Sequence, residues 1–597
     1  MAIEDYALYE REEPPLDAFE RTLYDEISAD EPWSLVEAFS ELERVSGSDD
    51  EEAAARYITD RLQAHGIEHE RYDPELWLSI PHEATLRATT PVEEEFEAVK
   101  TISFSESGTV SGEVVYVEAP EAESMDDVLS GGIGEIDQNL EDKIVVLETM
   151  SIAIDTIRKL EDAGAKAFIG IHPHPDEPHE GIATPIWGAQ PDPDETDKLP
   201  GIIIANVSRT VGDRLVELAT GGQPLQVEVN ADLTTDWFEC PVVVAHIPGE
   251  AAPDEDDFVL LHGHYDSWYV GITDNATGDA GLLETARVFN EHRDQLHRDL
   301  WVAWWPGHST GRYAGSTWFV DEFAHVLVDR CIAHLNMDSP GTADATEFED
   351  MVMWMPEADD LARSAIADVC GKDAEENRPV RAGDYSFNNL GITGLFMLSS
   401  NIPTEVREAR GYHPVGGCGG NSNAWHLSTD TLDKADPDVL VRDIRIYVTA
   451  IKRLLNEPIP PLDFRHTIAR HKESIADYAD EAGGHFDFSP IREELDALDD
   501  AVTVFYDAVD TGTIDAGTAT ETMKALSRGL VRLDFTSEGQ FEQDPATTRP
   551  PYPSLVPATN LPALEGNDYK FQRTHLKRAR NAVVHELKEL RRELPTT

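Results

Sequence analysis

The sequence predicts an α/β fold in which helices cover a sheet. Between residues 242 and 337, apolar runs typical of buried strands alternate with segments of helical spacing. Residues 100–235 form a second block with its own short strands and helices, and from about residue 460 only helical patterns remain. Because a repeated alternation of strand and helix requires helices on the faces of a sheet, we expect an α/β domain, an inserted β/α domain and a C-terminal helical domain.

The elements of the main domain follow from the spacing of apolar residues, since a short apolar run indicates a strand and a longer helical period a helix. In chain order we expect strand Val242–Ile247, strand Phe258–Leu261, helix Asp279–Arg293, strand Leu300–Trp305, helix Gly315–Phe323 and strand Ala333–Met337. Two helices are expected between residues 30 and 68, where the turn Ser46–Asp49 offers an N-cap to the second.

The inserted block has the strand-like runs VSGEVVYVEAP, KIVVLET and GIIIANVS, with a helix expected from Thr210 to Leu218. No catalytic set of residues stands out in it. We therefore divide the chain into residues 1–99 and 236–459 for the main domain, 100–235 for the inserted domain and 460–597 for the helical domain.

Charge is the most unusual property of the chain. The 47 Lys and Arg residues are outnumbered by 116 Asp and Glu residues, which gives a formal net charge of −69 over 597 residues. Such repulsion destabilises a compact state, but salt screens it when the Debye length falls to about 3 Å near molar concentration. We interpret the surface as adapted to a halophilic cytoplasm, with an acidic interaction protein as the alternative. Neither nucleic acid nor an anionic membrane is expected as a partner.

The four cysteines form neither a CxxC motif nor a disulfide framework, which favours a reducing compartment. The N-terminus has no basic segment followed by an apolar one, and no apolar run approaches about 18 residues. We therefore expect a cytoplasmic protein without a membrane segment.

Imidazole and carboxylate side chains gather where the predicted strands end, which is where α/β folds build sites. The candidates are His264, Asp266, Asp274, His308, Asp338 and His426, and all but His426 follow or end a strand-like run. A two-metal hydrolase needs such ligands around ions about 3.5–4 Å apart. The sequence therefore predicts a centre for two metal ions.

Six motifs occur in a fixed order along the chain: GHYDSW, DNATGDAGLLETAR, GSTWF, LNMDSPG, GDYSFNNLGI and WHLSTDTLDK. On these motifs the chain resembles the zinc-dependent exopeptidases that include glutamate carboxypeptidase II, the transferrin receptor and the leucyl-type aminopeptidases. The resemblance implies a three-layer α/β/α zinc-exopeptidase domain with a mixed central sheet. It also implies that residues 100–235 are a protease-associated domain and that the helical tail is a dimerisation domain, so a homodimer is expected.

The resemblance further implies roles for the candidate ligands. His264 and Asp338 would bind one Zn²⁺ ion, His426 would bind a second, and Asp274 would bridge the two ions. Asp266 would orient His264, since a ligating imidazole donates its other N–H to an acceptor.

One segment departs from the pattern of the family. Where the family carries a Glu-Glu pair, a general base followed by a ligand of the second metal, this chain reads WPGHSTGRYAGS. His308 in this segment is the natural substitute as a ligand, because imidazole binds zinc as readily as carboxylate does, and it is also the candidate for handling the proton. Farther along, the resemblance places Asp384 and Tyr385 in the substrate pocket.

We expect a zinc-dependent hydrolase, an exopeptidase or aminopeptidase, that cleaves a peptide bond by attack of a metal-bound hydroxide. Two alternatives stay open. The lost glutamates are compatible with a non-peptidase amidohydrolase acting on small or N-acyl amides. They are also compatible with an inactive binding or scaffolding homologue, as the transferrin receptor illustrates for this family.

The segment HPHPDEPHE contains three histidines that could mimic a metal cluster, His172, His174 and His179. Its prolines prevent a common face, and it belongs to the inserted block. We therefore interpret it as a solvated loop.

Overall fold

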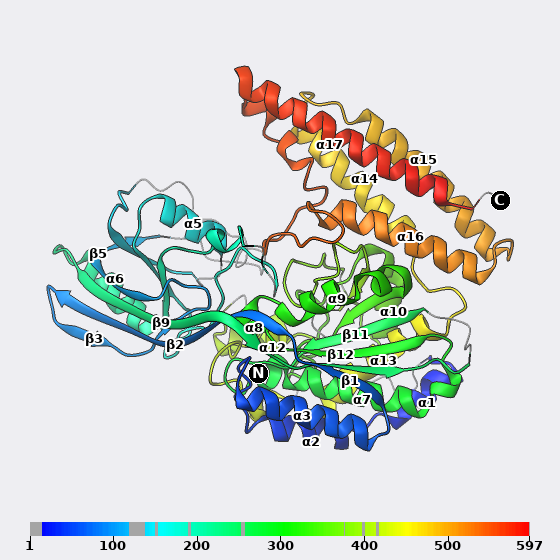
Figure 1. Ribbon diagram of the computed structural model, residues 1–597, viewed down its shortest axis with the longest axis horizontal. Coiled ribbons are helices and arrows are strands. Elements are labelled where there is room, and N and C mark those ends of the chain that lie inside the picture. Colours follow the sequence, from blue (N-terminus) through cyan, green and yellow to red (C-terminus); the bar gives the residue numbers. More distant parts are fainter. Residues whose placement is uncertain are drawn as a thin grey trace.

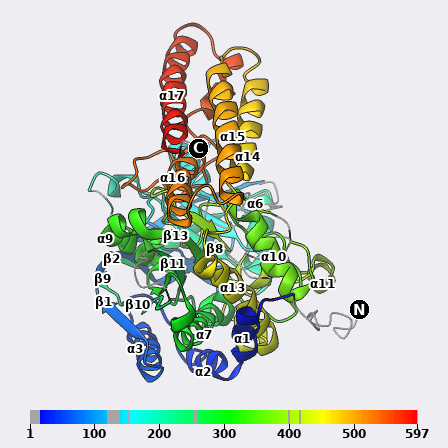
Figure 2. The ribbon, with the colours of Figure 1, turned by 90° about the vertical axis from the view of Figure 1, so that its right-hand side faces the viewer.

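The computed structural model of the protein describes residues 15–118, 138–149, 153–188, 191, 193–251, 257–374, 376–396, 400–413 and 417–595. These residues form a central sheet with helices around it, a second sheet beside it, and a helical bundle that projects away from both (Figure 1). Seen from the side, the bundle stands clear above the central sheet (Figure 2). The α/β fold that the sequence predicts is confirmed.

The central sheet has six strands in the order β1-β10-β12-β11-β13-β14. β11 lies between β12 and β13 and runs parallel to both, whereas β10 is antiparallel to both β12 and β1. The sheet is therefore mixed, as expected. Its strands are β1 (Glu68–Tyr72), β10 (Val242–Ile247), β11 (Phe258–His264), β12 (Asp299–Trp305), β13 (Cys331–Asn336) and β14 (Thr393–Leu395).

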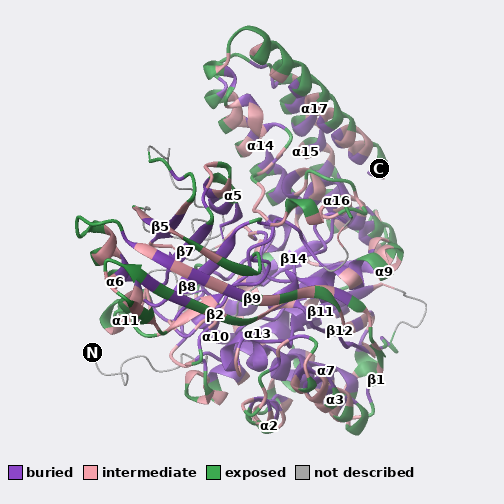
Figure 3. Cartoon of the chain, turned by 60° about the vertical axis from the view of Figure 1, so that its left-hand side comes forward, coloured by how far each residue is buried: buried purple, intermediate pink, exposed green. Residues whose placement is uncertain are grey.

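Helices cover both faces of this sheet. Because successive strand residues point to opposite faces, Val259 and Leu261 of β11 lie in one core and Phe258 and Leu260 in another. Figure 3 shows the sheet and the helices against it largely buried. The first core is packed chiefly by α2 (Asp30–Phe39), α3 (Asp49–Ala64), α7 (Thr277–Glu291), α10 (Asp359–Cys370) and α13 (Pro437–Asn456), and the second by α9 (Ala314–Arg330). The domain is thus a three-layer α/β/α structure.

The second sheet has eight strands in the order β3-β2-β9-β5-β6-β7-β8-β4. The long antiparallel pair β2 and β9 carries the chain out of the central domain and back (Figure 1). β5, β6, β7 and β8 are parallel neighbours, and α5 (Ile154–Asp162) and α6 (Arg209–Thr220) pack on them. The strands are β2 (Glu75–Thr90), β3 (Glu94–Phe96), β4 (Val99–Thr101), β5 (Gly108–Val117), β6 (Lys143–Leu147), β7 (Ala167–Ile171), β8 (Ile203–Val207) and β9 (Gln226–Glu239).

The C-terminal part of the described chain is a bundle of four helices, α14 (Phe464–Glu481), α15 (Ser489–Asp510), α16 (Ala516–Phe535) and α17 (Gly566–Glu593). α17 buries a stripe of apolar side chains at helical spacing, Leu576, Val583, Leu587 and Leu590, against α15 and α16. The remaining helices are α1 (Ala18–Glu26), α8 (His308–Gly311), α11 (Thr404–Arg410) and α12 (Cys418–Asn421). Among the described residues, no helix is both long and apolar enough to cross a membrane.

Candidate metal centre

Three buried side chains meet at the carboxyl end of the central sheet. His264 is the last residue of β11, Asp338 lies two residues after β13, and Asp274 stands in the irregular turn Ile272–Ala276 that leads into α7. β11 and β13 are parallel neighbours, so their ends bring His264 and Asp338 together. Open α/β sheets bind their ligands at this edge.

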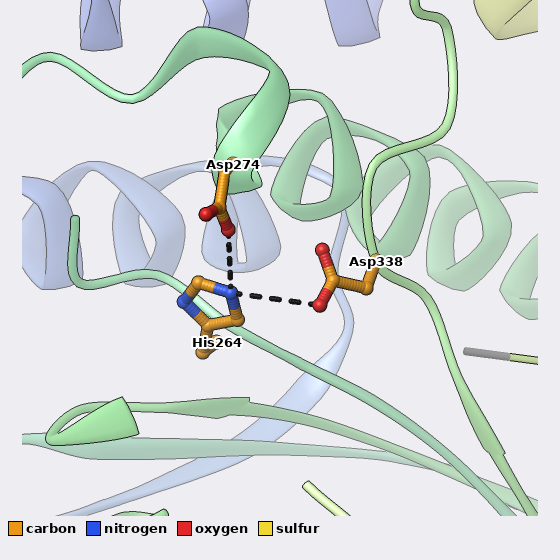
Figure 4. Close-up of side chains that lie close together, drawn as sticks. All are labelled: His264, Asp274 and Asp338. Atoms are coloured by element: carbon orange, nitrogen blue, oxygen red, sulfur yellow. Dashed lines mark ion pairs between the residues drawn. The ribbon is translucent and has the colours of Figure 1, made fainter. Parts of the chain in front are cut away.

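The three side chains face one point (Figure 4). His264 Nε2 lies 3.1 Å from Asp274 Oδ1 and 3.8 Å from Asp338 Oδ2, and the ligand atoms of all three residues lie within 4.8 Å of one another. His264 Nε2 and Asp274 Oδ1 nevertheless form no hydrogen bond with the described residues. Buried polar atoms that converge without bonding fit a shared cation, and imidazole with carboxylate oxygen is a donor set that zinc accepts.

Burial and mutual charge shift the pKa values of this group. Burial alone would lower the pKa of His264, but the nearby acids Asp266, Asp274 and Asp338 raise it well above its usual value. Burial raises the pKa of Asp338 to about 6, and the charge of Asp274 acts in the same direction. Burial would also raise the pKa of Asp274, but His264 and His426 hold it well below its ordinary value. A divalent cation would relieve the repulsion between these buried acids.

A second imidazole reaches the other oxygen of Asp274. His426 Nε2 lies 3.2 Å from Asp274 Oδ2, and the His426 backbone is left-handed, with φ 56°. Asp274 thus offers one oxygen to each imidazole, as a carboxylate that bridges two cations does. Within the described part of the chain, no third His, Cys, Asp or Glu brings a ligand atom within 4.8 Å of both Asp274 and His426.

Two buried residues that the sequence reasoning did not single out hold the turn around Asp274. The Asp430 carboxylate accepts hydrogen bonds from the backbone N–H of Thr273 and of Asp274, both at 3.1 Å, and from the Thr273 hydroxyl at 2.8 Å. Asn275 donates from Nδ2 to the His264 carbonyl at 3.3 Å. Asp430 lies in the WHLSTDT motif, but an acid in a loop shows no pattern that reveals such a role.

Asp266 holds both His264 and the neighbouring loop. His264 Nδ1 donates to the Asp266 backbone carbonyl at 3.0 Å, whereas the Asp266 carboxylate lies 3.7 Å from it. The carboxylate accepts the backbone N–H groups of His308 at 3.1 Å and Ser309 at 2.8 Å. Asp266 therefore orients the His264 ring mainly through its carbonyl and anchors the start of α8 through its side chain.

His308 lies beside the centre and is paired with an acid. Its ring stacks on the His264 ring, with centroids 3.6 Å apart, and its Nδ1 lies 3.1 Å from Asp384 Oδ2. Among the described residues, it does not join the three-residue ligand group. The neighbouring Asp384 Oδ1 and Tyr385 hydroxyl are buried and have no hydrogen-bond partner in the described chain. Their place in the substrate pocket stays a prediction.

The HPHPDEPHE segment is not the solvated loop that the sequence predicts. His179 is fully buried. His426 Nδ1 donates to the Glu180 carbonyl at 3.2 Å, and the Glu177 carboxylate accepts the N–H of Ser428 at 3.0 Å. The prediction was wrong because the segment packs against the loop of His426, a contact between distant parts of the chain that local composition does not encode.

Comparison with known proteins relates the central domain to peptidases. Residues 242–450, which contain all the candidate ligands, match the model of Peptidase family M28. A glutamate carboxypeptidase 2 homolog of Caenorhabditis elegans is 30% identical over 142 residues, which cover 23% of this chain and 17% of that protein. A probable glutamate carboxypeptidase of Arabidopsis thaliana is 26% identical over 288 residues, which cover 43% of this chain and 38% of that protein. The chain thus spans less than two fifths of the length of these curated relatives.

A solved structure shares the fold. An aminopeptidase from Aneurinibacillus sp. strain AM-1 superposes with a TM-score of 0.53 at 21% sequence identity. The match covers 73% of this chain and 96% of the aminopeptidase.

Proposed function

We propose that this chain is a metal-dependent exopeptidase that hydrolyses the terminal amide bond of a peptide. The match of residues 242–450 to the model of Peptidase family M28 supports the proposal. One observation carries the proposal. The side chains of His264, Asp274 and Asp338 converge in one buried site, where His264 Nε2 and Asp274 Oδ1 have no hydrogen-bond partner among the described residues. A chain that retains such a site is suited to metal-assisted hydrolysis rather than to binding alone.

The ligand atoms suit two zinc ions. His264 and Asp338 would hold the first ion, His426 the second, and Asp274 would bridge them. When bound, zinc polarises a carbonyl group and lowers the pKa of a water molecule toward neutrality. The first site has three ligands within 4.8 Å of one another, and the second rests on Asp274 and His426, so we expect the first site to bind zinc more tightly.

His308 would move the proton in place of the missing glutamate. The Asp384 carboxylate, 3.1 Å from His308 Nδ1, favours the tautomer with its proton on Nδ1 and so leaves Nε2 to accept one. His308 would take a proton from the attacking water and return it to the nitrogen of the leaving amine. Its side chain is 11% exposed, which gives substrate access to the edge of the ring.

The other parts of the chain would control access and assembly. The inserted domain would cover the centre, a role supported by the contact of Glu180 with His426. The helical domain would join two copies into a homodimer. The net charge of −69 supports work in the molar salt of a halophilic cytoplasm, where screening relieves the repulsion.

Zinc removal and a substrate panel test the proposal. We expect chelator-treated protein to lose hydrolysis of aminoacyl-anilides or dipeptides in molar KCl, and two equivalents of zinc to restore it. Hydrolysis of N-acyl amino acids without any exopeptidase activity would replace the proposal with a non-peptidase amidohydrolase. A protein that binds no zinc and hydrolyses no amide would be a scaffold.

A further inference from the structure

The fully buried imidazole of His179, in the inserted domain, packs against His426, the candidate ligand of the second metal ion. His179 is 0% exposed, and the centroid of its ring lies 4.8 Å from that of His426 and 4.8 Å from that of Trp425. Its backbone is held on both sides. The His179 carbonyl accepts a hydrogen bond from Asn206 Nδ2 at 2.9 Å, and the carbonyl of the next residue, Glu180, binds His426.

The ring of His179 has no hydrogen-bond partner at either nitrogen among the described residues. Burial without a hydrogen-bonded acid disfavours a charged imidazole, so the ring is neutral and has one donor and one acceptor. A donor and an acceptor that stay unpaired in the interior destabilise the folded chain. Groups retained at such a cost are typical of functional sites rather than of cores.

The surroundings of His179 point to the substrate rather than to a metal ion. The ring packs against that of His426, whose Nε2 lies 3.2 Å from Asp274 Oδ2. However, in the described chain His179 joins neither Asp274 nor His426 in a group of three ligand atoms within 4.8 Å. The ring is therefore near the centre without completing a coordination shell.

We propose that His179 is a substrate-contacting residue, whose ring N–H donates a hydrogen bond to the carbonyl oxygen of the amide held beside Asp274 and His426. The inference rests on the proposed function. A neutral donor binds this oxygen more strongly as it gains negative charge, so the contact stabilises the transition state more than the bound substrate. The inserted domain would then supply a group that acts in the reaction.

The test uses His179→Phe, which keeps a ring of similar size and removes both nitrogens. We expect kcat/KM on the best peptide substrate to fall about 10–100-fold, mainly through kcat, with zinc per chain unchanged. We also expect an apparent Tm equal to or above that of the wild type, because two unpaired buried atoms are lost. A purely structural histidine would not combine lower activity with undiminished stability.

His172→Phe is the matched control. His172 is 8% exposed and its ring centroid lies 5.1 Å from that of His179, but its Nδ1 accepts the backbone N–H of His174 at 3.3 Å. This substitution therefore breaks a hydrogen bond, and we expect a lower Tm with unchanged kcat.

Three results would overturn the inference: wild-type kcat/KM in the His179→Phe protein, a fall in Tm as large as in the control, or loss of zinc, which would make His179 a metal ligand. If the wild type hydrolyses no amide, the proposed function fails by itself. Calorimetric binding of L-leucine hydroxamate, whose carbonyl oxygen stands in for that of a substrate, then decides the inference. Binding about tenfold weaker to the variant supports the contact, and equal binding overturns it.

Discussion

Replacing Asp274 with Asn is expected to remove metal binding and activity together. Asp274 presents one oxygen to His264 at 3.1 Å and the other to His426 at 3.2 Å, whereas an amide has a single oxygen and no charge. Replacing a residue that only orients a ligand typically lowers metal affinity about 10–100-fold. Because Asp274 is itself a ligand, we expect its replacement to lower zinc affinity more than about 100-fold. kcat/KM should fall at least about 1,000-fold. Metal analysis after dialysis and peptide hydrolysis measure the two effects.

A second acid and imidazole group provides the control for this variant. Asp360, Asp463 and His466 also place ligand atoms within 4.8 Å of one another, but Asp360 and His466 are exposed. We expect Asp360→Asn to keep both tightly bound zinc and full activity, because exposed groups are well hydrated and bind metal weakly. Full activity in Asp274→Asn, or equal zinc loss in both variants, would contradict the assignment of the centre.

Replacing His308 with Gln is expected to lower kcat about 100–10,000-fold, the usual contribution of a positioned general acid or base. Gln keeps a polar side chain of similar length but cannot carry a proton between water and the leaving amine. Zinc bound by His264, Asp274 and Asp338 should remain, because His308 is not in that ligand group. Steady-state kinetics and zinc analysis on the same preparation check both expectations.

Replacing Asp384 with Asn is expected to lower kcat less than His308→Gln does. The Asn amide can still meet His308 Nδ1, which lies 3.1 Å from the present carboxylate, but it no longer stabilises the protonated ring. We expect kcat to lie between those of the wild type and His308→Gln. Unchanged kcat in His308→Gln would assign the proton to another group, and loss of zinc would make His308 a ligand.

The fold was predictable where the local spacing of apolar residues determines which side chains are buried. β10 has the bounds of the predicted strand Val242–Ile247, and β11 begins at Phe258 as expected, because strands buried on both faces are continuous apolar runs. The second N-terminal helix is also capped as predicted: the Ser48 hydroxyl accepts the Glu51 N–H at 3.1 Å. The group of His264, Asp274 and Asp338 could be predicted for the same reason, since each residue follows an apolar strand or belongs to a specific motif.

The rest depends on contacts between distant residues. β2 and β9 were not anticipated, because their alternation is weak, a proline interrupts β2, and their long pairing joins residues about 150 positions apart in the sequence. Likewise, the Asp384 partner of His308 lies 76 residues further along the chain. No local pattern could show that pairing, nor the burial of His179 beside His426.

The central claim is that His264, Asp274 and Asp338 hold a metal ion. Anomalous diffraction above the zinc absorption edge, from crystals grown with zinc, tests it most directly. We predict the strongest peak between His264 Nε2, Asp274 Oδ1 and Asp338 Oδ2, with a weaker second peak between Asp274 Oδ2 and His426. A zinc peak at the exposed group of Asp360 and His466, with none at the end of β11, would contradict it.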